Sequence, residues 1–142
     1  MANLSATVRD LKVLVIDDNP VLLLYLYQLL KSHGISVAQS PDTDDLKEKI
    51  GAFLPDVILL DVILGNEIDG RQVCQMLSLD PDYYVTPVIL ISSYEIDGES
   101  VADSGAYGFI AKPFETHELL DLLKAAKESG TPKITAAEPV QD

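Results

Sequence analysis

The sequence predicts an α/β fold in which one five-stranded parallel sheet is doubly wound, with helices on both faces. Three short apolar runs rich in β-branched residues support the sheet: residues 12–16 (KVLVI), 56–60 (DVILL) and 88–91 (VILI). Runs of this length without polar alternation are typical of strands buried on both faces. Apolar residues at helical spacing lie between the runs, and strands that alternate with helices fold through right-handed crossovers into a parallel sheet.

The remaining elements complete five strand–helix units. Weaker strand signals lie at residues 36–39 and 107–111. Helical patterns fill the gaps and follow the last strand, at about residues 20–34, 42–53, 70–79, 97–104 and 115–128. In sheets of this kind, ligands bind beyond the carboxyl ends of the strands, where the strand order reverses. The residues that follow the strands are therefore the candidates for a functional site.

The chain of 142 residues is long enough for one domain of ordinary size. We expect an N-terminal extension at residues 1–10, the folded domain at 11–128, and a flexible tail or linker at 129–142, where prolines and small polar residues gather. The single cysteine, Cys74, cannot form an internal disulfide and fits a reducing compartment. Its apolar helical neighbours predict a buried thiol.

Charge and hydropathy exclude several classes of protein. The chain has 10 Lys and Arg against 23 Asp and Glu, a net charge of −13, which disfavours direct contact with nucleic acid or an anionic membrane. The longest apolar stretch, residues 21–30, is interrupted by Gln28 and is shorter than the roughly 20 residues that span a bilayer. The N-terminus shows no signal-peptide pattern. We therefore expect a cytoplasmic protein without a membrane segment.

Acidic and polar residues follow the strands. Asp17 and Asp18 come after the first strand, Asp61 after the third, Ser92 after the fourth and Lys112 after the fifth. Three carboxylates at one edge of a sheet would raise each other's pKa values unless a cation or an ammonium group lies among them. Oxygen ligands of this kind suit Mg²⁺. Each aspartate alone is more often a helix cap, but together with a lysine and a hydroxyl they indicate a site.

Four segments agree, in order and spacing, with a known family. They are VLVIDDNP at 13–20, DVILLDVILGNEIDG at 56–70, PVILISS at 87–93 and GAYGFIAKPF at 105–114. Over about residues 11–128 the sequence resembles the receiver domain of response regulators, the CheY-like family of two-component signalling. The resemblance implies a flavodoxin-like fold. It also implies a phosphoacceptor switch, to which a histidine kinase or a histidine phosphotransfer protein of a phosphorelay donates a phosphoryl group.

The resemblance assigns a role to each residue of the site. Asp61 would be the phosphoacceptor. Asp18 and Asp61 would bind Mg²⁺ directly, together with the backbone carbonyl of Ile63, and Asp17 would act through a metal-bound water. Mn²⁺ would substitute for Mg²⁺. Phosphoryl transfer needs mainly a placed nucleophile and positive charge around the phosphoryl oxygens, and Mg²⁺ and Lys112 can supply that charge.

The resemblance also implies a switch. Ser92 would donate its hydroxyl to a phosphoryl oxygen and, by moving, vacate a pocket that Phe109 then fills; family members often carry Tyr at that position. Pro87 identifies Ser92 as the switch hydroxyl, because in the family this hydroxyl lies five residues after such a proline. The family has the peptide bond between Lys112 and Pro113 in cis, which would aim the lysine at the acyl phosphate.

The loop from Asp61 to Gly70 departs from the commonest receivers, because it is one residue longer. The variant occurs in the family and leaves the phosphoacceptor in register. Within this loop we expect Asp69 to cap the third helix and not to bind metal. Glu67 is expected to be a solvated loop residue.

Two other classes share parts of this pattern. A flavodoxin-like binding module needs a Gly/Ser/Thr-rich phosphate loop after the first strand, where this chain has Asp17 and Asp18. A Mg²⁺-dependent phosphatase of the haloacid dehalogenase type has its nucleophile in a DxD pattern that is absent at both strand ends. Turnover would also need a base that activates water, and Ile63 and Tyr94 are poor bases. We therefore expect a signalling domain and not an enzyme. Such a domain catalyses only its own phosphorylation and slow dephosphorylation.

The first helix is the expected docking surface for the phosphodonor. The residues expected to face the sheet share helical spacing: Leu22, Tyr25, Leu26, Leu29 and His33. Leu23, Leu24 and Tyr27 would then project outward, where a surface helix usually carries polar residues. In the family this helix packs against the helical bundle that presents the phosphohistidine. The sequence leaves the cognate kinase and the output open.

Overall fold

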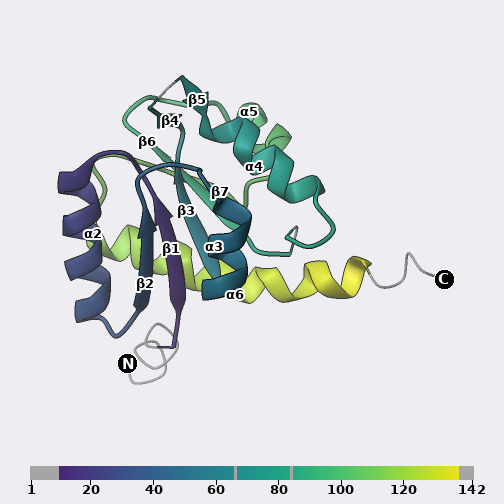
Figure 1. The fold of residues 1–142 in the computed structure, drawn as a ribbon, viewed down its shortest axis with the longest axis horizontal. Coiled ribbons are helices and arrows are strands. Elements are labelled where there is room, and N and C mark those ends of the chain that lie inside the picture. The colour runs from purple at the N-terminus through teal and green to yellow at the C-terminus, as the bar shows by residue number, and fades with distance from the viewer. Residues whose placement is uncertain (1–9, 66, 84, 138–142) are drawn as a thin grey trace.

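The computed structural model describes residues 10–65, 67–83 and 85–137, with side chains as far as residue 129. The described residues form a main sheet, a small hairpin and five helices (Figure 1). In chain order the elements are β1 (Lys12–Ile16), α2 (Pro20–Ser32), β2 (Ser36–Ser40), α3 (Leu46–Phe53), β3 (Val57–Asp61), β4 (Ile63–Leu64), β5 (Ile68–Asp69), α4 (Gly70–Leu79), β6 (Val88–Ser92), α5 (Gly98–Asp103), β7 (Gly108–Ala111) and α6 (Thr116–Ala137).

The main sheet has five parallel strands in the order β2-β1-β3-β6-β7. The chain runs outward from β1 to β2, crosses to β3 on the other side of β1, and continues outward through β6 to β7 (Figure 1). The strand order therefore reverses between β1 and β3, which places the carboxyl ends of these two strands at the switch point where such folds bind ligands. The predicted doubly wound, flavodoxin-like architecture is confirmed.

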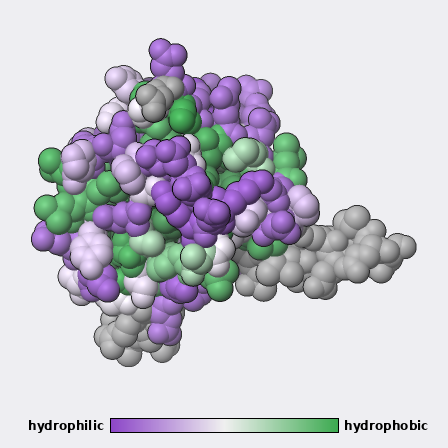
Figure 2. All heavy atoms as spheres, viewed as in Figure 1, coloured by the Kyte–Doolittle hydropathy of each residue, from purple (hydrophilic) through white to green (hydrophobic). Residues whose placement is uncertain are grey.

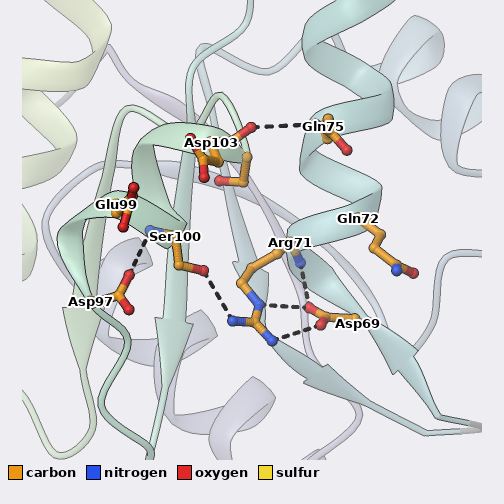
Figure 3. Close-up of a pocket in the computed structure, with 9 residues that line it drawn as sticks. Asp69, Arg71, Gln72, Gln75, Asp97, Glu99, Ser100 and Asp103 are labelled. Atoms are coloured by element: carbon orange, nitrogen blue, oxygen red, sulfur yellow. Dashed lines mark hydrogen bonds and ion pairs between the residues drawn. The ribbon is translucent and has the colours of Figure 1, made fainter.

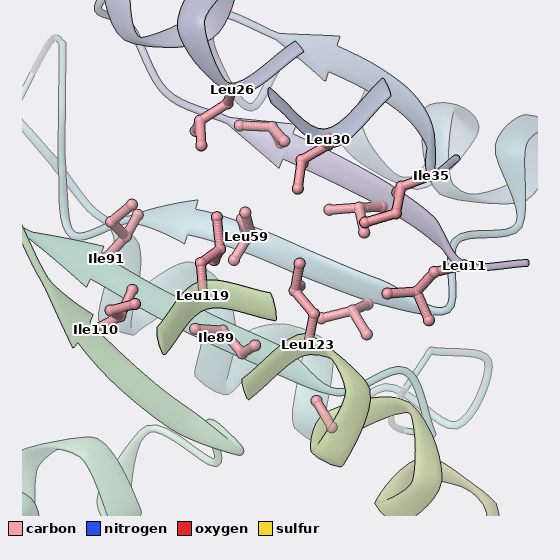
Figure 4. Close-up of a cluster of buried hydrophobic side chains, with 14 residues drawn as sticks. Leu11, Leu26, Leu30, Ile35, Leu59, Ile89, Ile91, Ile110, Leu119 and Leu123 are labelled. Atoms are coloured by element: carbon pink, nitrogen blue, oxygen red, sulfur yellow. The ribbon is translucent and has the colours of Figure 1, made fainter. Parts of the chain in front are cut away.

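Each face of the sheet has its own hydrophobic core. Alternate strand residues point to opposite faces, so the valines and isoleucines of one strand divide between the two cores. On one face, the sheet packs against Leu26 and Leu30 of α2 and Leu119 and Leu123 of α6 (Figure 4). On the other face, it packs against α3 and α4, where Cys74 is buried as predicted. The two layers fix the strands, and through them the edge that carries the site.

Helix α2 begins where the sequence predicts, because Asn19 caps it. The Asn19 side chain accepts hydrogen bonds from the N–H groups of Val21 (3.0 Å) and Leu22 (3.3 Å). Pro20 occupies the first helical position, where a missing N–H costs nothing. The start of this helix is thereby fixed directly after Asp17 and Asp18.

The buried face of α2 differs from the predicted one. Leu26 and Leu30 are fully buried, whereas Tyr25 is 49% exposed and His33 is exposed at the end of the helix. Leu23 is partly buried and packs against the core. The prediction that Tyr25 and His33 face the sheet, and that Leu23 projects outward, is therefore wrong. Residues 21–30 are apolar nearly all round the helix, so the spacing of apolar residues is compatible with burial of several different faces. The face that is buried in the structure carries leucines, and the tyrosine hydroxyl stays in water.

Some element boundaries also differ from the prediction. Helix α3 begins at Leu46 and not near residue 42, because residues 41–45 form bends and turns and Asp45 has a left-handed φ of 54°. Helix α6 continues to Ala137, beyond the predicted end at 128. Residues 1–9 of the predicted extension and 138–142 of the predicted tail lie outside the described residues. None of the helices in the described ranges has the length and apolar character that crossing a membrane requires.

Candidate functional site

The carboxyl ends of β1 and β3 bring three aspartates together. Asp17 and Asp18 directly follow β1, and Asp61 is the last residue of β3. One carboxylate oxygen of each residue lies within 4.8 Å of those of the other two. Asp17 and Asp61 are buried, and Asp18 is exposed. The aspartates converge because β1 pairs directly with β3 in a parallel register, which aligns the ends of both strands.

Lys112, which follows β7, directs its ammonium group at two of these carboxylates. Its Nζ lies 3.1 Å from Asp17 Oδ2 and 3.5 Å from Asp61 Oδ2. The backbone N–H of Lys112 donates to the carbonyl of Ser92 at 2.8 Å, so the end of β6 supports the lysine. The peptide bond from Lys112 to Pro113 is cis, as the resemblance implies. The structure thus brings Lys112 to the aspartates from 95 residues away along the chain.

Each buried carboxylate is also held by a local backbone hydrogen bond. Asp17 Oδ1 accepts from the N–H of Asn19 at 2.8 Å, and Asp61 Oδ1 accepts from the N–H of Ile63 at 3.1 Å. Such bonds to the residue two positions ahead fix the orientation of an aspartate side chain. In both residues Oδ1 is therefore turned to the backbone and Oδ2 is turned to Lys112.

The site has more negative than positive charge. Burial, and after it the negative charge of Asp17, raise the pKa of Asp61 from 3.8 to about 6, against the opposing effects of the Ile63 N–H and the Lys112 ammonium group. One ammonium group cannot balance three ionised carboxylates. The cluster offers only oxygen donors, which are the ligands that hard divalent cations such as Mg²⁺ and Mn²⁺ prefer. The residues present therefore fit a divalent cation.

Ser92 lies on β6, the strand next to β3, and Phe109 lies on β7, the edge strand beyond β6. Ser92, the last residue of β6, is buried, and its Oγ accepts a hydrogen bond from the N–H of Tyr94 at 3.0 Å. Asp61 pairs with Ile91, one residue before Ser92. Phe109 of β7 is partly buried and packs against the core on the α3/α4 face. The serine is thus next to the aspartate cluster, whereas the phenylalanine belongs to the core behind it.

Sequence analysis missed the hairpin that closes the loop after Asp61. Strands β4 and β5 pair Ile63 with Asp69. As predicted, Asp69 caps α4, accepting from the N–H of Arg71 at 2.8 Å, and Glu67 is exposed. The ion pair between Asp69 and Arg71, at 2.8 Å, was not foreseen, although Asp and Arg two residues apart at a helix start could have suggested it.

Gly70, the first residue of α4, packs directly against the backbone of the phosphoacceptor candidate. A Cβ atom at this position would lie 2.1 Å from the carbonyl oxygen of Asp61. The N–H of Gly70 donates to the carbonyl of Val62 at 2.6 Å. Only a residue without a side chain allows this approach of helix to strand end. The signal in the sequence is the glycine that follows the cap Asp69.

Comparison with known proteins agrees with this geometry. The family model of the response regulator receiver domain matches residues 13–124. The protein PilG of Pseudomonas aeruginosa is 34% identical over 124 residues, which are 86% of this chain and 91% of PilG. The response regulator MprA of Mycolicibacterium vanbaalenii is 31% identical over 129 residues, which are 89% of this chain and 54% of MprA. The chain therefore spans most of PilG and about half of MprA.

A solved structure is also similar. The signal receiver domain of a signal transduction histidine kinase from Syntrophus aciditrophicus has a TM-score of 0.72 and 25% identity, with 84% of this chain and 91% of that one covered. The family model and these relatives point to one family, and they give no support to the alternative of a haloacid dehalogenase phosphatase. The chain belongs to the response regulator receiver domain family, the phosphoacceptor domains of two-component signalling.

Proposed function

We propose that Asp61 accepts a phosphoryl group from the phosphohistidine of a histidine kinase or a histidine phosphotransfer protein. One observation carries the proposal: the Asp61 carboxylate lies among two other carboxylates and the Lys112 ammonium group, at the switch point of the sheet. The bond between phosphorus and the donor's imidazole nitrogen breaks, and a bond between phosphorus and an Asp61 oxygen forms. The donor histidine is released as a free imidazole, and Asp61 becomes an acyl phosphate.

The chain's own residues prepare Asp61 for this step. The Ile63 N–H holds Asp61 Oδ1, which leaves Oδ2 on the side of Lys112. The lysine ammonium group attracts the incoming phosphoryl oxygens. We propose that Asp18, Asp61 and the carbonyl of Ile63 hold Mg²⁺, or Mn²⁺ in its place, with Asp17 acting through a water. The bound cation would supply positive charge to the phosphoryl oxygens.

We propose Ser92 and Phe109 as the switch. The Ser92 hydroxyl now accepts from the N–H of Tyr94, and it would give up this bond when it turns to donate to a phosphoryl oxygen. Phe109 is only partly buried, whereas the residues of the neighbouring strand β6 are all buried. The Phe109 ring is therefore less tightly enclosed than the side chains of β6. A ring in such a place can change position when Ser92 moves.

The domain is proposed to catalyse only its own phosphorylation and slow dephosphorylation. The side chains that follow Asp61 and Ser92 by two residues are Ile63, 53% exposed, and Tyr94, 66% exposed. Neither is a base that could take a proton from an attacking water. We also propose that the domain works in the cytoplasm and does not contact nucleic acid directly, which its net charge of −13 supports.

We propose that the phosphodonor docks on the exposed face of α2. Leu24 is 58% exposed and Tyr27 is 42% exposed, and Val21 and Tyr25 extend the apolar surface toward the site. Hydrophobic surface is visible at the left edge of Figure 2, where Figure 1 places α2. An apolar surface beside an otherwise acidic site fits the apolar face of a helical bundle. The helix begins directly after Asp18, so a donor seated here would reach Asp61.

The phosphoacceptor is tested by labelling with acetyl phosphate and Mg²⁺ and by intact mass measurement. Wild type should gain one phosphoryl group, and Asp61→Asn should gain none. Asp56→Asn is the matched control, because Asp56 precedes the same strand at its opposite end. Retained labelling of Asp61→Asn, with the group on Asp17 or Asp18, would contradict the assignment.

A further inference from the structure

A bridge of polar side chains joins the loop after Asp61 to α5. The Arg71 guanidinium donates from Nε and Nη2 to the two oxygens of Asp69, at 3.1 and 2.8 Å, and from Nη1 to Ser100 Oγ at 3.0 Å. Figure 3 shows the guanidinium lying between the aspartate and the helix that carries the serine. A planar guanidinium can serve both partners at once, which a lysine ammonium group on a flexible chain does less well. We call these residues the Asp69–Arg71–Ser100 bridge.

One end of the bridge belongs to the hairpin beside the phosphorylation site. Asp69 of β5 pairs with Ile63 of β4, and the N–H of Ile63 donates to Asp61 Oδ1 at 3.1 Å. Asp69 also caps α4 through the N–H of Arg71. A continuous series of contacts therefore leads from Asp61, through the hairpin, to the guanidinium of Arg71.

The other end holds a short helix whose residues are all exposed or partly exposed. Helix α5 is six residues long, and none of its residues is buried. Besides the bond from Arg71 to Ser100, Gln75 Nε2 of α4 donates to the carbonyl of Asp103 at 3.4 Å. A short helix without a buried side chain depends on such contacts for its position, because its own backbone bonds are too few to keep it formed.

The charges around Arg71 favour this arrangement. A cavity of about 360 Å³ between α4 and α5 is lined by Asp97, Glu99 and Asp103, and Arg71 is the one cation among its lining residues. Asp69 and Arg71 also line a second cavity, of about 270 Å³, which reaches Ser92. The Arg71 side chain is 40% exposed, so solvent screens the ion pair and its net contribution to stability is small. The bridge therefore acts on position more than on stability.

We propose that Arg71 is a positioning residue for the phosphorylation site: through Asp69 it holds the hairpin that carries Ile63, and through Ser100 it ties this hairpin to α5. The inference rests on the proposed function, because the Ile63 carbonyl is the proposed backbone ligand of Mg²⁺. A cation that orders the hairpin then also orders α5. Such coupling is reciprocal: the factor by which the bound cation favours the ordered α5 equals the factor by which the ordered α5 strengthens binding of the cation. Loss of the bond to α5 therefore weakens the binding of the cation by that factor.

The test compares four variants of the full chain by calorimetric titration with Mg²⁺ and by hydrogen exchange of the α5 amides. Arg71→Gln and Ser100→Ala break the bridge. Ser100→Thr keeps the hydroxyl, and Gln75→Ala removes the other hydrogen bond between α4 and α5. The two bridge variants should bind Mg²⁺ about fivefold more weakly, the lower end of ordinary coupling between sites. Ser100→Thr and Gln75→Ala should bind as wild type does.

Hydrogen exchange supplies the second reading. Mg²⁺ should slow exchange of the α5 amides in wild type, Ser100→Thr and Gln75→Ala, and should leave it unchanged in the two bridge variants. If Arg71→Gln does not fold, Ser100→Ala carries the test, because it only removes a hydroxyl from a partly exposed position. Equal Mg²⁺ affinity in all variants, an equal loss in Gln75→Ala, or faster α5 exchange with Mg²⁺ would each overturn the inference. Absence of Mg²⁺ binding to wild type would instead overturn the proposed metal site, and the inference with it.

Discussion

The raised pKa of Asp61 predicts that removing its charge stabilises the metal-free protein. Asp61 has a pKa of about 6 in the folded chain, against an ordinary value of 3.8, because burial and the charge of Asp17 disfavour the carboxylate. Between these two pH values the folded state binds more protons than the unfolded state, so stability falls as the pH rises from 3.8 to about 6. Above that range the loss of stability stays constant at about 3 kcal/mol, because each unit of difference between the two pKa values is worth about 1.36 kcal/mol.

The substitution Asp61→Asn converts this loss into a gain. Asparagine resembles the protonated carboxyl in shape and charge, and it can still accept from the Ile63 N–H. In EDTA the variant should be more stable than wild type by about 3 kcal/mol at pH 7.5, by roughly half of that at pH 5 and by less than about 1 kcal/mol at pH 4. For a domain of this size, the gain at pH 7.5 corresponds to a rise in Tm of about 10 °C.

The assay is urea unfolding at these three pH values, followed by circular dichroism. Asp121→Asn, an exposed aspartate on α6, is the control and should show no comparable gain. A gain that is equal at pH 4 and pH 7.5, or a variant that is less stable than wild type at pH 7.5, would refute the reasoning. In Mg²⁺ the difference in stability between variant and wild type should shrink or change sign, because a cation at the proposed site would stabilise the native state of wild type and would lose a ligand in the variant.

Three further predictions concern the backbone, the donor and the acyl phosphate. Gly70→Ala should lower stability by about 1–3 kcal/mol in thermal unfolding, because its Cβ would overlap the Asp61 carbonyl, whereas Gly98→Ala, which meets nothing within 4 Å, should not; equal Tm values would contradict this. Leu24→Glu should slow transfer from the protein donor, followed on phosphate-affinity gels, and leave labelling by acetyl phosphate unchanged. Leu79→Glu, at an even more exposed apolar position on α4, should change neither rate. The acyl phosphate should persist for minutes or longer in a pulse-chase experiment, because Ile63 and Tyr94 do not activate water; decay within seconds would show that another group does.

The site could be predicted from the sequence because it depends on strand ends. Three buried strands are recognisable from their apolar runs, and a parallel register places the residues after them on one edge. The convergence of Asp17 and Asp61 therefore follows from local patterns. The pKa of Asp61 does not follow in the same way, because it depends on how deeply the other elements cover the carboxylate.

Other features had no comparable signal. The strands of the hairpin have two residues each, too few to show a period. The orientation of α2 was misjudged because its apolar residues surround the helix, so that only packing decides which of them are buried. The bond from Arg71 to Ser100 joins residues 29 apart on two helices, and neither position stands out in the sequence. Such contacts are set by the relative placement of whole elements.

The contact of Gly70 with the Asp61 backbone also has a genetic consequence. Every single-nucleotide change in a glycine codon that replaces glycine by another amino acid introduces a side chain, so each such replacement at position 70 brings a Cβ atom against the Asp61 carbonyl oxygen. Gly51 and Gly98 are encoded by the same kind of codon but have open space around them. The single-nucleotide change from glycine to alanine should therefore be accepted at both positions. A scan of all substitutions, selected on signalling, should therefore show fewer accepted amino acids at position 70 than at positions 51 and 98, and this codon should limit how far the loop between Asp61 and α4 can change in descendants of the chain.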